Sequence, residues 1–473
     1  MDTILCDELL QEIFHRLPPS SSSAASLVSK RWLRLCRSSK TSLCLRFSPQ
    51  TFTLASLSSF LFHYPYLSSL SLTAAAGDDA ASALFDHLLL SVASSCPNLQ
   101  HLRFLTCPVS FFSLLSLSVS CPNLTSLSIS LSRPLSFHWI TSFLSLKDLT
   151  VVFTGNELNS DEFDSQEEHR DEMIRKNFNF SLPLESLSLS GTRPGDNSLN
   201  WLWRSCKKIK RLQLRSCEGI GDTSLFSLFL KCLTCLQELE LRTCRTIVDR
   251  VLLILAENCI SLNSLLVYDG GSKEGLLQFI STSRCNMQKL DLRLPLDLDN
   301  NHLLAVASKF RGLSCLRLQS CCLVTGEGLK SLGLAMSNGL EELALINCDV
   351  VEREPGLLTT LGQNLRGLRK LDLSHNEMLL DKELISMLVS CTCLGELKVR
   401  GCKRLTNAAM VSILKSCKFL ERVDIMRCGG IEVNAVELFI LNSPQLRLIQ
   451  VEESKLSDVA RMRASNKMIE VTV

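Results

Sequence analysis

Leu236-Gln-Glu-Leu239-Glu-Leu241-Arg-Thr-Cys244 is the clearest copy of a short motif that recurs along most of this 473-residue chain. The same order of apolar residues and a cysteine returns at Leu340 to Cys348 and at Leu394 to Cys402. The second and third apolar residues of each copy lie two positions apart, so they point to the same face of a short strand. The motif therefore predicts one half-buried strand per copy.

The first apolar residue of each copy marks the phase of a repeat, and from Leu184 onward these markers are 25 to 28 residues apart without interruption. Helix-like segments at Asp222–Leu230 and Asn407–Lys415, each with its first residue as the expected N-cap, separate the strands. One strand and one helix cannot bury an apolar face alone, so neighbouring copies must stack. We therefore expect an α/β fold, a curved leucine-rich-repeat solenoid over residues 47–454 followed by a C-terminal cap at 455–473. Its about 15 repeats start at Leu67, Leu99, Leu124, Leu146, Leu184, Ile209, Leu236, Leu262, Met287, Leu313, Leu340, Leu368, Leu394, Leu420 and Leu446.

Composition and charge restrict the class of protein. Aromatic residues make up only 6% of a chain that is 46% hydrophobic, which suits the thin aliphatic core of a repeat stack. The net charge of +2 favours neither nucleic acid nor an acidic substrate as the partner. No run approaches the roughly 18 apolar residues of a membrane span, and the first residues are acidic, unlike a signal peptide. We expect a soluble protein of the cytoplasm and/or nucleus, with no cofactor and no membrane or nucleic-acid partner.

Most of the 22 cysteines occupy two positions of the repeat. A thiol there is a compact, nearly apolar group with a weak donor for a neighbouring carbonyl. We predict reduced, structural cysteines in preference to zinc at Cys232-x-x-Cys235, a disulfide such as Cys402–Cys428, or a catalytic thiol. The column that ends the strand motif holds Cys107, Cys217, Cys244, Cys321, Cys348, Cys402 and Cys428, with Asn376 in the same place in its own repeat. The column three residues before the first apolar position holds Cys96, Cys121, Cys206, Cys259, Cys391 and Cys417.

Residues 1–46 lack the repeat and favour two short amphipathic helices. Apolar residues between Leu5 and Leu17 are spaced by three and four, with Asp7 as the expected cap and Pro18-Pro19 as the terminator. A second amphipathic stretch covers Ala24–Cys36. Helices this short make a poor core by themselves, so either a partner protein completes them or they cap the open end of the solenoid.

Both helices resemble the F-box. Leu5-Cys-Asp-Glu-Leu-Leu-Gln-Glu-Ile-Phe-His-Arg-Leu-Pro18 is similar to the opening helix of that motif, although Cys6 stands where the family usually has proline. Ala25-Ser-Leu-Val-Ser-Lys-Arg-Trp-Leu33 is similar to its second signature, a Val-Ser/Cys-Lys-x-Trp core. With cysteine-containing leucine repeats behind it, the chain resembles the F-box and leucine-rich-repeat protein family, plant members included.

That resemblance implies a non-catalytic subunit of a ubiquitin ligase. The sequence itself also argues against an enzyme, because no phosphate loop, nucleophile elbow or His/carboxylate cluster is present in it. The F-box would bind a Skp-type adaptor, and through it cullin and RING subunits, while the repeats bind a protein substrate. Two alternatives stay open: a small-molecule or hormone co-receptor of the same architecture, as in some plant members, and a repeat scaffold without a ubiquitin role. The predicted Skp-binding residues are Leu5, Leu9, Leu10, Ile13, Phe14, Leu17, Pro18, Leu27, Val28 and Trp32.

Arginines recur between and after the apolar residues of the strand motif, on the face opposite the predicted helices. Guanidinium groups there could hold a carboxylate, a phosphate or another small anionic ligand. Acidic neighbours (Glu240, Asp291, Asp372 and Asp424) could instead pair with them and leave a solvated, mixed face. The predicted substrate or ligand residues are Arg215, Arg242, Tyr268, Arg293, Arg317 and Arg400.

The repeat is interrupted once, by an acidic insert at residues 155–181 that contains eight carboxylates between Glu157 and Glu172. A segment of this kind is expected to be a surface loop. The basic run from Arg204 to Arg215 follows it one repeat later. We expect the insert either to fold back on this run as a salt-sensitive gate or to be a spacer without contact.

Overall fold

The computed structural model describes residues 5–17, 23–47, 54–74, 82–155, 181–220, 229, 233–294 and 297–472. The chain forms two compact units, Met1–Cys232 (unit 1) and Leu233–Val473 (unit 2). The division falls inside the predicted solenoid, so each unit carries repeats of the same kind.

The repeat phase is confirmed strand by strand. Each strand from β2 to β16 begins two residues after one of the predicted markers, as β8 (Glu238–Arg242) does after Leu236. The predicted α/β leucine-rich-repeat fold with an N-terminal helical module is therefore correct. Two strands lie outside the prediction: β1 (Ser42–Phe47), within the segment assigned to the helical module, and β17 (Glu470–Thr472), within the segment assigned to the cap.

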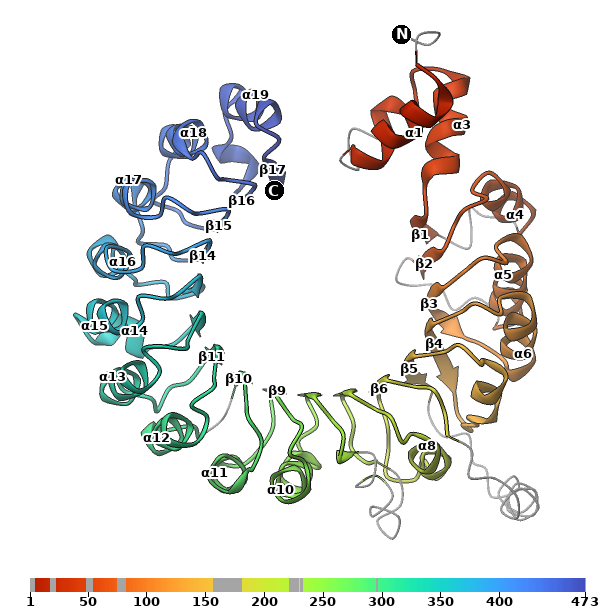
Figure 1. The fold of residues 1–473 in the computed structure, drawn as a ribbon, viewed down its shortest axis with the longest axis horizontal. Coiled ribbons are helices and arrows are strands. Elements are labelled where there is room, and N and C mark those ends of the chain that lie inside the picture. Colours follow the sequence, from red (N-terminus) through yellow and green to blue (C-terminus); the bar gives the residue numbers. More distant parts are fainter. Residues whose placement is uncertain are drawn as a thin grey trace. The chain divides into compact units, whose positions relative to one another are not determined.

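Unit 1 begins with the helical module and continues as a parallel sheet in which consecutive strands β1 to β7 pair, with one shift of register between β3 and β4 after Phe104. Helices lie along one face of this sheet (Figure 1). Leucines of the strands, such as Leu127 and Leu187, point toward the helices and are buried. The elements are α1 (Asp7–Arg16), α3 (Lys30–Ser39), β1 (Ser42–Phe47), α4 (Leu54–Phe62), β2 (Ser69–Ala74), α5 (Ser82–Ser95), β3 (His101–Pro108), α6 (Phe111–Ser120), β4 (Ser126–Ser132), η1 (His138–Ser142), β5 (Asp148–Thr154), β6 (Ser186–Ser190), α8 (Leu199–Ser205) and β7 (Arg211–Arg215).

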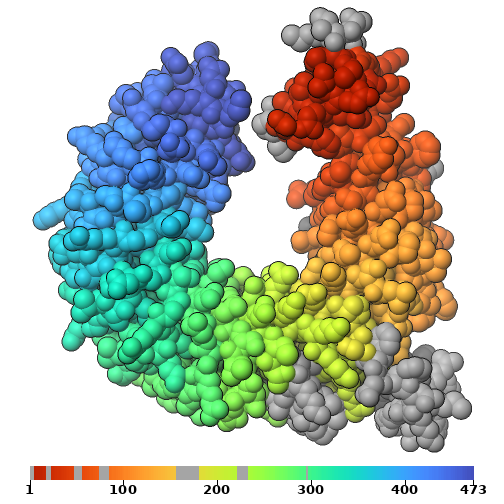
Figure 2. All heavy atoms as spheres, in the orientation of Figure 1, coloured from red at the N-terminus to blue at the C-terminus, as the bar shows by residue number. Residues whose placement is uncertain are grey.

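Unit 2 repeats the same strand-and-helix pattern, with its strands on the inner side of the stack and its helices on the outer side (Figure 1). Adjacent repeats are in continuous contact along this unit (Figure 2). The strands are β8 (Glu238–Arg242), β9 (Ser264–Tyr268), β10 (Lys289–Arg293), β11 (Cys315–Gln319), β12 (Glu342–Ile346), β13 (Lys370–Asp372), β14 (Glu396–Lys398), β15 (Arg422–Asp424), β16 (Leu448–Gln450) and β17 (Glu470–Thr472). The helices are α10 (Val248–Asn258), α11 (Lys273–Thr282), α12 (Asn300–Lys309), α13 (Gly326–Ala335), α14 (Val350–Arg353), α15 (Leu357–Asn364), α16 (Asp381–Leu388), α17 (Asn407–Ser416), α18 (Val433–Asn442), η3 (Glu453–Lys455) and α19 (Asp458–Asn466).

The predicted helix caps are displaced by one residue. Thr406, not Asn407, is the N-cap of α17, and its side chain accepts a hydrogen bond from the Ala408 amide. Asn407 is the first helical residue and instead bonds Glu432 of the next repeat through its side-chain amide, at 2.9 Å. The helix expected at Asp222–Leu230 lies, apart from Phe229, outside the described residues.

A left-handed turn follows the strands from β5 to β15. It is made by a glycine such as Gly191 (φ 82°) or by a residue such as Asn347 (φ 49°). Such backbone is accessible to glycine and tolerated by asparagine. The turn reverses the direction of the chain, and the next residue in most repeats is the buried cysteine, or Asn376, of the first column.

The structure confirms the packing role of the two cysteine columns. Of the thirteen column cysteines, twelve are buried and Cys107 is half-buried. Their thiols approach backbone carbonyls of the preceding repeat, as Cys402 Sγ does at 3.2 Å from Leu373 O. Desolvation raises the pKa of Cys96 and of Cys121 to about 11, so these groups stay thiols at neutral pH. Cys235 is exposed, and Cys232 lies outside the described residues.

None of the described helices combines the length and the apolar character needed to cross a membrane.

Candidate functional site

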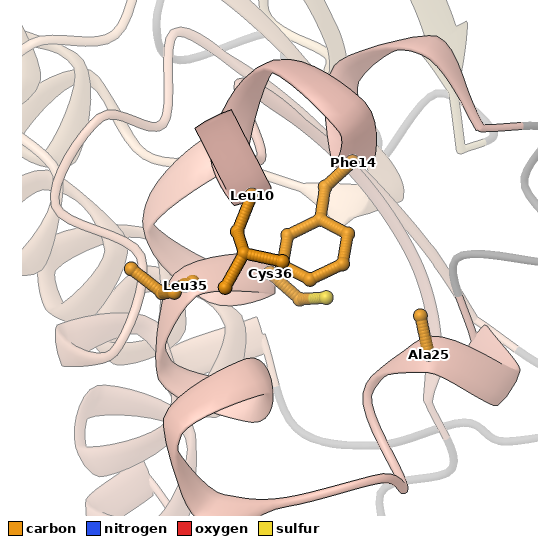
Figure 3. Close-up of a cluster of buried hydrophobic side chains, with 5 residues drawn as sticks. All are labelled: Leu10, Phe14, Ala25, Leu35 and Cys36. Carbon is orange, nitrogen blue, oxygen red and sulfur yellow. The ribbon is translucent and has the colours of Figure 1, made fainter. Parts of the chain in front are cut away.

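The helical module closes around a small apolar core. Leu10 and Phe14 of α1 point toward Leu35 and Cys36 of α3 and toward Ala25 (Figure 3). The indole ring of Trp32 packs against Phe14 edge-on, with 5.3 Å between ring centroids. Leu5 and Leu17 pack against the same cluster and are only partly buried. These predicted Skp-binding residues therefore form or support the interior of the module.

Four other predicted Skp-binding residues lie on the surface of the module. Leu9 and Ile13, one turn apart on α1, are 54% and 43% exposed. Leu27 and Val28, in the turn before α3, are 87% and 61% exposed. Exposed aliphatic side chains on a module this small are typical of protein-binding surfaces. We call these four residues the exposed apolar surface of the module; Pro18 lies outside the described residues.

The second amphipathic stretch is broken where the sequence suggested one segment. Residues 23–25 form a helical turn, and α3 starts only at Lys30. Ser29 makes the break because its side chain accepts a hydrogen bond from the Trp32 amide at 3.2 Å and caps α3. The break leaves Leu27 and Val28 on a turn that projects from the module.

Polar contacts fix α1 against α3. The guanidinium of Arg31 donates to Asp7 Oδ1 from Nε (2.9 Å) and Nη2 (2.6 Å) and to the carbonyl of Leu5 at 2.8 Å. Asp7 is the first residue of α1 and not its cap; the N-cap is Cys6, which makes no side-chain capping bond. Asp7 therefore acts by joining the two helices, with its charge near the helix N-terminus.

The predicted arginine stripe lies on the inward face of unit 2, the sheet face opposite the helices, and its arginines pair with carboxylates. Arg242 bonds Glu240, and Arg293 bonds Asp291 at 2.7 Å. Arg400 bonds Asp424 at 2.9 Å. Tyr268 lies between the first two pairs, since β9 pairs with both β8 and β10.

Arg317 is the centre of this face. Its guanidinium lies 2.8 Å from Glu342, 3.2 Å from Asp372 and 3.5 Å from Asp291, which belong to three different strands. All four carboxylates named from the sequence thus pair with the stripe. The geometry favours a mixed, internally neutralised face over a strongly cationic one, and a substrate role for these residues stays a prediction.

The ion pairs of Arg317 with its three carboxylates form a network, and the pH dependence of the stability of the variant Arg317→Met tests it. Burial alone would raise the pKa of Glu342, but the hydrogen bond and charge of Arg317, with Lys370, hold that pKa below its ordinary value of 4.5. The resulting stabilisation is present above pH 4.5 and is lost as the pH falls through the lowered folded-state pKa. We expect Arg317→Met to cost about 1–3 kcal/mol at pH 7, because three carboxylates lose their common partner. The difference in the free energy of unfolding between the variant and the unaltered chain, measured by urea unfolding, should be smaller near pH 4.

Arg245→Met is the matched control, because the Arg245 side chain is 71% exposed and forms an ion pair with a single carboxylate of the described residues, Asp269, at 2.8 Å. An exposed pair of this kind contributes about 0–1 kcal/mol. An equal loss for Arg317→Met at both pH values would contradict the network.

Arg215, the remaining member of the predicted stripe, lies on β7 in unit 1. It belongs to the exposed basic run, in which Lys210 pairs with Glu185 at 2.8 Å. Residues 156–180 of the acidic insert are outside the described residues, so the gate remains a prediction.

The inward face of unit 1 differs in character from that of unit 2, and the arginine pattern did not predict this difference. From β4 to β6 the positions between the buried leucines carry mainly hydroxyl groups in register, such as the half-buried Ser128 beside Thr150 and Thr150 beside the buried Ser188. The alternation of serine with leucine or isoleucine, as in Ser126-Leu-Ser-Ile-Ser130, was the available signal. Most of this surface is uncharged and made of small side chains.

Comparison with known protein families assigns the helical module to one of them. The model of the F-box domain family matches residues 3–42. The module is an F-box domain. The match confirms the resemblance seen in the sequence, and it ends where β1 begins, so the F-box leads directly into the sheet.

A curated protein of Caenorhabditis elegans is similar to part of this chain. The chain is 24% identical over 258 residues to the putative RNA-binding protein EEED8.10 of Caenorhabditis elegans; the match covers 54% of this chain and 31% of the relative. The chain thus spans about a third of the length of that relative.

Two of the solved structures similar to this chain align over most of its length. The yeast Rad7 and Elc1 complex contains a chain aligned over 96% of this protein and 94% of its own length, at 15% identity and a TM-score of 0.46. An internalin of Listeria monocytogenes aligns over 88% and 93%, at 12% identity and a TM-score of 0.32.

Proposed function

We propose that this protein is a substrate-recognition adaptor of a ubiquitin-protein ligase of the Skp–cullin–F-box type. The observation that carries the proposal is an F-box domain at residues 3–42 with Leu9, Ile13, Leu27 and Val28 exposed on its surface. Its own core is already closed by Leu10, Phe14 and Leu35. The exposed side chains are therefore available for a partner without unfolding the module.

The partner for this surface is a Skp-type adaptor, which would link the chain to cullin and RING subunits. The repeats supply the substrate-binding surface, and the chain itself acts as a non-catalytic subunit in the cytoplasm and/or nucleus. On the inward face of unit 2 the arginines are paired with acids, so a matching substrate carries charges of both signs rather than one. This feature favours a protein substrate over a small, strongly anionic ligand at that face.

Reconstitution with purified components tests the proposal. The full chain, co-expressed with a Skp-type adaptor, is expected to elute with it as one complex at micromolar concentration. Addition of cullin, RING and ubiquitin-conjugating subunits is expected to transfer ubiquitin to proteins retained by the chain. Separate elution of a folded chain and a folded adaptor would exclude this role and would leave the repeat scaffold as the explanation.

A further inference from the structure

Two cysteines of the first column, Cys321 and Cys348, occupy matching positions in successive repeats of unit 2. Each comes three residues after one of two leucines that face each other in register, Leu318 of β11 and Leu345 of β12. Neighbouring strands lie about 4.8 Å apart, and the Cα atoms of disulfide-bonded cysteines are roughly 4.4–6.8 Å apart. The register of the strands therefore brings these two cysteines to a separation that a disulfide can span.

The two thiols are in contact. The Cys348 thiol reaches back to the preceding repeat, where its Sγ lies 3.6 Å from Leu318 O. The Cys348 sulfur also accepts hydrogen bonds from the Cys321 thiol and from the Cys321 amide. The Cys348 amide is fixed in turn by Asn376 Oδ1, at 2.9 Å. The packing of the repeats thus holds the two sulfur atoms side by side as thiols.

The contact between the thiols makes their acidities different. The hydrogen bonds from the Cys321 thiol and from backbone amides lower the pKa of Cys348, because they stabilise its thiolate. The same thiol contact, followed by desolvation, raises the pKa of Cys321, which remains the donor. The thiolate is the nucleophilic form of cysteine, so Cys348 is the more reactive member of the pair.

The pair is buried but lies close to the surface of the repeat. Cys322 and Leu323, directly after Cys321, are exposed, and so is Asn347, directly before Cys348. A local opening of these two turns is enough to admit a small reagent. The placement therefore suits a small oxidant such as a peroxide better than a bulky disulfide.

We propose that Cys321 and Cys348 are a modification site, at which hydrogen peroxide forms a reversible disulfide between two repeats. The Cys348 thiolate attacks the O–O bond and becomes a sulfenic acid, and the hydroxide that leaves takes up a proton to give water. The Cys321 sulfur then attacks the sulfenic sulfur: the S–S bond forms, the S–O bond breaks, and the oxygen leaves with the thiol proton as a second water. Two thiols lose two electrons in all, and one peroxide gains them.

The disulfide links the turns that directly follow β11 and β12. The same two strands carry Arg317 and Glu342, whose ion pair at 2.8 Å joins them on the inward face. A covalent link at their carboxyl ends therefore fixes the spacing of the two strands at the centre of the arginine network. The inference concerns this pair of thiols alone and stands whether or not the chain serves a ubiquitin ligase.

Mass spectrometry of the full chain after brief exposure to hydrogen peroxide tests the site. Cys322→Ser is the starting protein, because Cys322 is exposed and its products would be confused with those of the adjacent Cys321. Remaining thiols are blocked in denaturant with iodoacetamide, and the chain is digested without a reductant. We expect a cross-linked pair of peptides that joins Cys321 to Cys348 and that dithiothreitol separates.

Cys402 and Cys428 are the internal control. They occupy the same column in successive repeats and are also buried. Their thiols instead donate to carbonyls, Leu373 O at 3.2 Å and Val399 O at 3.0 Å. We therefore expect this pair to stay reduced at the dose of peroxide that links Cys321 to Cys348.

The variant Cys321→Ser, made in the same starting protein, separates the two steps. Its hydroxyl still donates to Cys348 but cannot form a disulfide, so the reaction should stop at the sulfenic acid of Cys348. Dimedone, which labels sulfenic acids, is expected to mark Cys348 in this variant about tenfold more than in the starting protein. The proposal is overturned if no link between Cys321 and Cys348 forms, or if Cys402 and Cys428 become linked to the same extent.

Discussion

Replacement of both Leu9 and Ile13 by alanine is expected to weaken binding of a Skp-type adaptor about a hundredfold or more, while the chain stays folded. Both side chains are exposed on α1, one turn apart. Burial of such a side chain in an interface contributes roughly 1.5–3 kcal/mol, so two truncations remove at least about 3 kcal/mol. Calorimetric titration of the adaptor into each purified full-length variant measures the loss.

Two comparisons separate binding from folding. Phe112→Ala with Val119→Ala also truncates two exposed apolar residues of one helix, α6, outside the F-box domain, and should leave adaptor binding unchanged. Leu10→Ala removes a buried side chain and should destabilise the F-box domain by about 2–5 kcal/mol. If the variant with Leu9 and Ile13 replaced binds like the unaltered chain, the exposed apolar surface is not the docking site.

The repeat explains why the sequence predicted the strands so well. A strand in a solenoid is set by a local motif, and neighbouring copies of that motif fix its register, so each marker from Leu67 to Leu446 located one strand. The strands β1 and β17 were missed because each has a neighbouring repeat on only one side. Neither is preceded by a marker at the expected spacing, and β17 has only three residues.

Helix starts were predicted less well, because one hydrogen bond decides them. Ser29 divides the second amphipathic stretch of the F-box domain through a single bond to the Trp32 amide. Thr406 takes the cap that Asn407 was expected to provide. Both errors concern a hydroxyl side chain that accepts a hydrogen bond from a nearby backbone amide, and apolar periodicity carries no information on such bonds.

The sites depend on contacts between distant residues, which no local pattern reveals. Arg317 and Asp372 are 55 positions apart in the sequence, and Arg133 and Asp196 are 63 apart. The sequence showed that acids lay near the arginine stripe, but only the strand register shows that they pair with it.

Asn376 is the position at which a single substitution is expected to destabilise unit 2 most. It occupies the place that cysteine holds in neighbouring repeats and is buried. Its amide donates to Leu345 O and Leu373 O, both at 2.8 Å, and its Oδ1 accepts from the Cys348 amide at 2.9 Å. One side chain therefore satisfies three backbone groups and joins two repeats.

Alanine at this position removes the side-chain partner of Leu345 O and of the Cys348 amide and leaves Leu373 O only the weak thiol donor of Cys402, at about 1–3 kcal/mol for each unsatisfied group. We expect Asn376→Ala to lower the free energy of unfolding by about 3–5 kcal/mol in urea titrations. Asn376→Cys should cost less, since the thiol restores one weak donor, as Cys402 Sγ shows toward Leu373 O at 3.2 Å. Asn442→Ala, at an exposed asparagine whose side-chain amide donates to Leu438 O of the same helix, is the control and should change stability by less than about 1 kcal/mol.

Asn376→Asp distinguishes the donor role from the acceptor role. The aspartate keeps an oxygen for the Cys348 amide but turns a second oxygen toward two carbonyls, so it is expected to destabilise at least as much as alanine at pH 7. On acidification the carboxyl gains a proton and becomes a hydrogen-bond donor, so the aspartate variant should recover part of its lost stability. Hydrogen exchange at Cys348 gives the second readout: the amide should lose protection in the alanine variant and keep it near pH 4 in the aspartate variant. Equal protection of this amide in the alanine variant and the unaltered chain would mean that Asn376 does not join the two repeats.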